Sequence, residues 1–258
     1  MKQPAATRQP AAACLYYSPI IHMEADLGSL GQELDARGQA SFGEESWNRH
    51  QRTVEAFWHS IQTFLRVLPA EGLILFQDGM VAGGEVGERI VREVAKSGSL
   101  NFQILEELLG RGATLVQTED LALVKTERDR LLRITQAAGT GAKLRAYLAY
   151  RWGKRRLLQQ RDAFIGQRIL EELKPGRRGL LLLGAEHRVV PMLPPTIQAT
   201  ALKDPEAMRA YRTLLLHPRR NPLELGRLTG LLTAPVETSL LYNPLGTDLQ
   251  SAPKEQQN

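Results

Sequence analysis

The chain of 258 residues has a single cysteine, Cys14, so no disulfide can form within it. It also lacks any run of about 18 apolar residues, the length that a membrane-spanning helix needs. Residues Met1 to Pro10 are polar and interrupted by proline, without the apolar stretch of a secretory signal. We therefore expect a cytoplasmic protein with no membrane partner.

Two common functional motifs are missing as well. No Gly-x-Ser-x-Gly sequence is present, so Ser-His-Asp catalysis has no support. The glycines at 79, 83, 84 and 87 match neither the dinucleotide-binding nor the P-loop spacing. We interpret them as a turn that leads into a helix.

The composition is that of an ordinary globular protein, with 43% hydrophobic and 24% charged residues. The length suits one large domain, which we place at residues 13–245. Residues 1–12 and 246–258 are predicted to be disordered tails. The net charge of +5 permits a polyanionic partner without requiring one.

Short apolar runs alternate with longer stretches of helical periodicity. This alternation predicts an α/β fold: a mostly parallel central sheet flanked by helices. Predicted strands cover residues 14–21, 73–76, 113–116 and 179–183, and a weaker one covers 197–201. Predicted helices cover residues 44–68, 85–96, 100–109, 142–173 (with a break near Gly153) and 205–216, besides one that Thr118 caps and that runs to Arg133. No regular element is predicted after Asn221.

Polar side chains follow each of the first four predicted strands. They include His22 and Glu24, then Gln77 and Asp78, then Thr118 and Glu119, and finally Glu186 and His187. Parallel strands bring their carboxyl ends to one edge of the sheet, where ligands usually bind. Two imidazoles among carboxylates can bind a divalent metal or act as general acid and base. A histidine after a strand is as often a structural residue.

Arg161 and Asp162 form a second informative feature. Helical spacing places Asp162 on the same stripe as Leu158, Ile165 and Ile169, facing the core, with Arg161 beside that stripe. A buried aspartate requires a partner. Two interpretations are equally supported: a structural Arg161–Asp162 ion pair, or a pair that orients a group of the site.

These segments carry a family resemblance. An Arg-Asp pair on a helix, followed by an apolar strand and Gly-x-x-His, resembles the C-terminal signature of the TraB/TIKI-like superfamily. Here it comprises Gln160-Arg161-Asp162 and Gly184-Ala185-Glu186-His187. In the family a first strand also leads to Gly-x-x-His, and later strands end in acids, which His22 and Glu119 match. Pro19 replaces the glycine of that first motif, and Gln160 replaces a common glutamate.

The resemblance implies a site formed by His22, Glu24, Glu119, Arg161, Asp162, Glu186 and His187. The family includes pheromone-shutdown proteins, TIKI metalloproteases, ChaN-like haem-binding proteins and erythromycin esterases. We therefore expect a hydrolase of ester or peptide bonds, acting on a small molecule or a peptide. In it, His22 and His187 bind a divalent metal or one of them activates water, and Arg161 stabilises negative charge. The alternative is a non-catalytic protein that binds a small ligand such as haem.

The segment from Arg130 to Arg161 supports a third, less favoured hypothesis. It holds nine basic and no acidic residues, with Tyr147, Tyr150 and Trp152 among them. Such a surface can contact phosphates and stack on bases. A solvated helix face explains the same pattern, so nucleic-acid binding is the less favoured function.

Overall fold

A computed structural model describes residues 12–21, 43–215 and 220–241. The predicted tails and the residues His22 and Glu24 lie outside these ranges, apart from Ala12. Within them, no helix is both long enough and apolar enough to cross a membrane.

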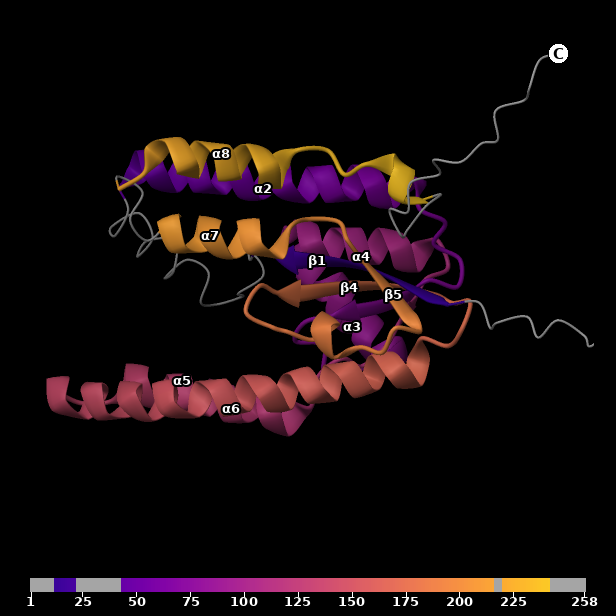
Figure 1. The fold of residues 1–258 in the computed structure, drawn as a ribbon. Coiled ribbons are helices and arrows are strands. Elements are labelled where there is room, and N and C mark those ends of the chain that lie inside the picture. Colours follow the sequence, from indigo (N-terminus) through magenta and orange to yellow (C-terminus); the bar gives the residue numbers. More distant parts are fainter. Residues whose placement is uncertain (1–11, 22–42, 216–219, 242–258) are drawn as a thin grey trace, which may run out of the picture.

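The predicted α/β class is confirmed: five parallel strands form one sheet in the order β3-β2-β4-β1-β5 (Figure 1). The central strands are almost continuous runs of apolar residues because helices cover both of their faces. The strands are β1 (Ala13–Ile20), β2 (Ile74–Gln77), β3 (Thr114–Leu115), β4 (Arg178–Gly184) and β5 (Ile197–Ala201).

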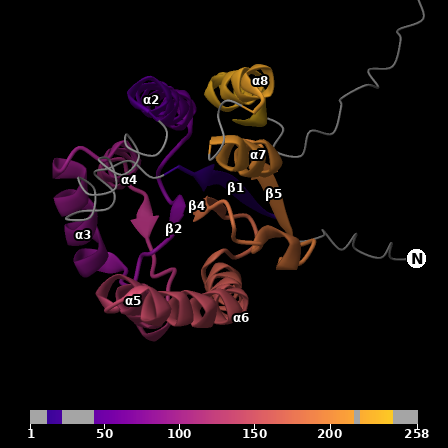
Figure 2. The ribbon, with the colours of Figure 1, turned by 90° about the vertical axis from the view of Figure 1, so that its left-hand side faces the viewer.

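One face of the sheet packs on α2 (Glu44–Val67), α4 (Leu100–Gly110), α7 (Pro205–Leu215) and α8 (Pro222–Thr233). The fully buried Phe57, Trp58 and Phe64 of α2 form much of this core. Helix α3 (Gly84–Lys96) lies at the β3 edge, as Figure 2 shows. Two short 3-10 helices, η2 (Val190–Met192) and η3 (Thr238–Leu241), complete the described elements.

The opposite face packs on the C-terminal half of α6 (Thr140–Glu172), through Ile165 and Ile169. Helix α5 (Leu121–Gln136) pairs with the N-terminal half of α6 to form a long hairpin that projects beyond the sheet (Figure 1). The predicted break at Gly153 is wrong, since α6 continues through it. A β-carbon there would lie 2.5 Å from the Arg130 guanidinium, so glycine permits the close approach of α5.

Two other local predictions are corrected. Asp120, rather than Thr118, caps α5, and its carboxylate accepts hydrogen bonds from the amides of Ala122 and Leu123. Helix α8 was not predicted, although Asn221 as its cap and Pro222 in its first turn are a common helix start.

The chain connections diverge between β2 and β4, and we call the carboxyl ends of these two strands the crevice. The connection after β2 leads to β3 at one side of the sheet, and the connection after β4 leads to β5 at the other side. Adjacent parallel strands whose connections diverge in this way leave space at their carboxyl ends, where α/β proteins bind ligands. Asp78 follows β2 at this point, and His187 follows β4.

His50 of α2 lies at the edge of the core. Its ring lies between Trp47 and Tyr211, and its Nδ1 is 2.9 Å from the Tyr211 hydroxyl. Burial lowers the pKa of His50 from 6.5 to about 4.

This pKa predicts acid sensitivity. Between pH 6.5 and pH 4 the unfolded chain binds a proton at His50 that the folded chain does not. The resulting stability is present above pH 6.5 and is lost as the pH falls toward 4, by at most about 3 kcal/mol. Urea titrations over this range should show that the free energy of unfolding depends less steeply on pH in His50→Gln than in the wild type. The exposed His59→Gln on the same helix is the control; equal slopes in both variants would contradict the assignment.

Candidate functional site

A buried cluster of charged side chains occupies the crevice between β2 and β4. Asp78 comes from the end of β2, Glu119 from the residues after β3, and His187 from the turn after β4. One ligand atom from each of these three side chains lies within 4.8 Å of the others. Segments more than a hundred residues apart are thus brought together by strand order.

Arg161 of α6 holds the acids of this cluster. Its Nε lies 3.1 Å from both carboxylate oxygens of Glu119, and its Nη2 donates to Glu119 at 2.5 Å and to Asp78 at 2.8 Å. Its Nη1 donates to Glu127 of α5 at 2.6 Å. One guanidinium therefore links the ends of β2 and β3 to the base of the helical hairpin. The planar fork of arginine suits such multiple carboxylate contacts.

Asp162, the next residue of α6, holds the loop after β4. One carboxylate oxygen lies 2.5 Å from His187 Nδ1, and the other accepts a hydrogen bond from the Arg188 amide at 3.0 Å. His187 Nε2 then lies 3.7 Å from the Asp78 carboxylate. The predicted Arg161–Asp162 ion pair is not found, because successive helical residues point in different directions and each finds its own partner.

The surroundings shift the pKa values of Glu119, His187 and Arg161. Burial raises the pKa of Glu119; Arg161 opposes this, and the charge and hydrogen bond of Asp78 add to it. Burial lowers the pKa of His187, but the hydrogen bond to Asp162 and the charge of Asp78 outweigh that effect and raise it overall. The pKa of Arg161 is raised despite burial, by Glu119, Asp78 and Glu127. Arg161 is thus a permanent cation among four acids.

Four of the predicted site residues lie in this cluster: Glu119, Arg161, Asp162 and His187. Glu186 does not, because it points to solvent and pairs with Lys154 at 2.8 Å and with Arg212 at 3.6 Å. The predicted His22 and Glu24 lie outside the described residues.

Two further residues belong to the cluster and were not among the predicted site residues. Asp78 was recognised as a polar group at a strand end, and its position after β2 was the signal that could have placed it there. It also accepts the Gly184 amide at 2.9 Å, which joins β2 to the β4 turn. Glu127 has no comparable signal in the sequence, because a glutamate in the middle of a helix is usually solvated.

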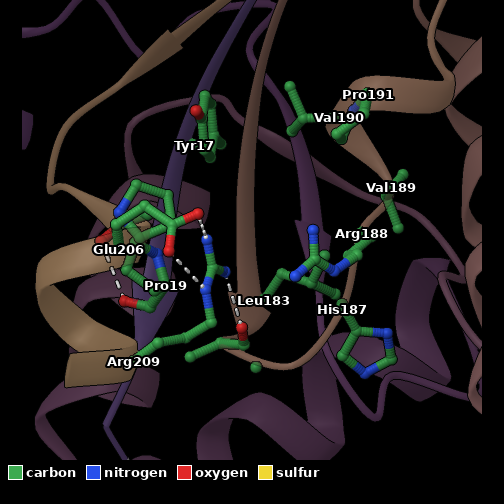
Figure 3. Close-up of a pocket in the computed structure, with 14 residues that line it drawn as sticks. Tyr17, Pro19, Leu183, His187, Arg188, Val189, Val190, Pro191, Glu206 and Arg209 are labelled. Carbon is green, nitrogen blue, oxygen red and sulfur yellow. Dashed lines mark hydrogen bonds and ion pairs between the residues drawn. The ribbon is translucent and has the colours of Figure 1, made fainter.

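A pocket of about 290 Å³ opens beside His187, at the carboxyl ends of β1 and β4 (Figure 3). Its walls are largely apolar, and Arg209 crosses one side, donating to Glu206 and to the Ala185 carbonyl. This arginine already has its anionic partner. The pocket is also lined by Tyr17, Pro19, Leu183, Val189, Val190 and Pro191.

No protein-family model matches the chain, and comparison with curated proteins and with solved structures found no match either. The assignment of a function consequently depends on the geometry of the cluster and of the pocket.

Removal of the central cation should destabilise the fold. In Arg161→Ala, Asp78 and Glu119 lose the cation between them, and we expect the free energy of unfolding to fall by about 3–5 kcal/mol. Arg92 of α3 pairs with Glu88 at the surface, so Arg92→Ala should cost about 1 kcal/mol or less. Urea denaturation in EDTA measures both; equal losses would show that the buried network does not hold the sheet edge.

Gly184 tests the spacing of the cluster without removing a charge. A β-carbon at this position would lie 2.8 Å from Asp78 Oδ2 and 3.4 Å from His187 Cδ2. Gly184→Ala should therefore displace Asp78 and lower the free energy of unfolding by about 1–3 kcal/mol. The control is Gly226→Ala in α8, where a β-carbon meets nothing within 4 Å. An unchanged free energy of unfolding in Gly184→Ala would contradict the close packing of Asp78 against the turn after β4.

Proposed function

We propose that the chain is a metal-dependent hydrolase of ester or peptide bonds, of the TraB/TIKI-like type. One observation carries this proposal: Asp162 engages His187 Nδ1 and leaves Nε2 facing Asp78 and Glu119. A carboxylate that fixes one ring nitrogen while the other faces a group of acids is the usual arrangement around a metal-binding histidine.

The donor set fits a divalent cation. Imidazole nitrogen and carboxylate oxygen both bind zinc, and three protein ligands leave a position for water or substrate. The charge balance fits as well. Asp78, Glu119, Glu127 and Asp162 contribute four acids, against which Arg161 is the one permanent cation in the contacts described above. A buried excess of negative charge favours cation binding.

Asp78, Glu119 and His187 would hold the metal, with His187 binding through Nε2. A bound divalent metal would supply an activated water and polarise the bond to be cleaved. Asp162 would keep the imidazole in one tautomer by accepting a hydrogen bond from its Nδ1–H group. Arg161 would fix the two carboxylates; its donors are already occupied, so we revise its expected role from charge stabilisation to positioning.

The pocket beside His187 supports a site that acts on an apolar group. Pro19, Val189 and Val190 contribute apolar wall to this pocket, which His187 also lines. Such a cavity can hold the acyl or side-chain part of a substrate next to the reacting bond, and its walls limit the access of bulk water.

Metal binding provides the first test. Titration calorimetry with Zn²⁺ and Mn²⁺ on the chelator-treated protein should show one tight site per chain. We expect Asp78→Asn, Glu119→Gln and His187→Ala each to weaken binding at least tenfold, with folding checked by circular dichroism. Glu186→Gln is the control, since Glu186 points to solvent. Wild-type protein that binds neither metal would contradict the metal site.

Hydrolysis provides the second test. The metal-loaded protein is incubated with p-nitrophenyl esters and with a mixed peptide library analysed by mass spectrometry. Cleavage that is lost in Glu119→Gln and kept in Glu186→Gln supports the proposal. A change in the visible absorbance spectrum of haem when the protein is added, without any cleavage, would instead favour the non-catalytic alternative.

A further inference from the structure

The projecting half of α6 carries an exposed surface that the proposed chemistry does not use. Leu144, Tyr147 and Leu148 are 57%, 46% and 37% exposed, which is high for large apolar side chains. Arg151 and Arg155 follow them toward the sheet, are also exposed, and pair with no acid among the described residues. We call these five residues the arginine–leucine face.

Helix geometry places this face on the same side of α6 as the residues that pack on the sheet. From Asp162, steps of four and three residues back along the helix lead to Leu158, Arg155, Arg151, Leu148 and Leu144. Helix α5 covers another side of α6, where Arg130 approaches Gly153. The stripe that begins at the cluster as buried Asp162 thus continues along the hairpin as an exposed face.

We propose that the arginine–leucine face binds an acidic, leucine-bearing segment of a polypeptide substrate. This inference rests on the proposed hydrolase, which supplies both the substrate and the cleaved bond from which its residues are counted. The charge is complementary, because the helix carries no acidic residue before Asp162. The apolar side chains distinguish the occupant: a nucleic acid stacks on aromatic rings but offers no apolar partner to Leu144 and Leu148.

The order of residues along α6 sets the order of residues in the substrate. At 1.5 Å per residue, Arg155 and Arg151 lie about 10 and 16 Å from Asp162, and Leu144 lies about 27 Å away. An extended peptide covers about 3.3 Å per residue. Acidic side chains are therefore expected about three to five residues from the cleaved bond, and apolar ones about six to eight residues from it.

Fluorescence anisotropy with three labelled 14-residue peptides tests this inference. The first has two glutamates followed by two leucines at this spacing, the second has lysines in place of the glutamates, and the third has serines in place of the leucines. The full-length, metal-free protein is used, so that binding is measured without cleavage. The first peptide should bind at least tenfold more tightly than the other two.

Matched charge reversals locate the surface. Arg151→Glu/Arg155→Glu should weaken binding of the first peptide at least tenfold, and Leu144→Ser/Leu148→Ser should do so at least fivefold. Arg52→Glu/Arg89→Glu, on exposed positions of α2 and α3, changes the net charge equally and should alter affinity less than twofold. Equal effects of the two charge reversals would overturn the proposal.

The remaining outcomes separate this inference from the proposed function. Tighter binding to phosphatidylglycerol vesicles or to oligo(dT) than to the first peptide would overturn the substrate surface in favour of a membrane or a nucleic acid. Tight and selective peptide binding without cleavage by the metal-loaded protein would support the surface while contradicting the hydrolase. Cleavage that is unaffected by Arg151→Glu/Arg155→Glu would support the hydrolase while contradicting the binding surface.

Discussion

The contacts of Arg161 are the constraint on which the site depends. Three acids, one following β2, one following β3 and one in α5, meet one guanidinium, which places a positive charge beside the buried Glu119. The same helix then presents Asp162 to His187. Two adjacent residues of α6 therefore align both sides of the crevice, so the position of α6 on the sheet determines the geometry of every group in the cluster.

Much of this arrangement follows from local patterns in the sequence. The apolar runs of β1, β2 and β4 are distinctive because both of their faces are covered, and the polar residues after them mark the carboxyl edge. Asp162 was placed toward the core by helical spacing alone. These features are short-range, so periodicity and strand ends are sufficient to locate them.

Other features depend on contacts that no local pattern encodes. Glu127 joins the cluster only because α5 lies against α6, and Glu186 leaves it because the turn after β4 directs that side chain to solvent. Gly153 is expected to break a helix, yet it allows Arg130 of the neighbouring helix to approach. The sequence shows which residue types are present, but the pairing of helices decides which of them meet.

The central position of β4 has a consequence for folding. This strand fits between β1 and β2, both of which precede it by about a hundred residues or more. Contacts of such long sequence separation form slowly, because much chain entropy is lost before they are made. His187 directly follows β4, so the cluster assembles only when the middle of the sheet is filled. In a nascent chain that has emerged only as far as α5, Asp78 and Glu119 are present but His187 is not yet made. Any activity of the cluster must therefore await the completed sheet.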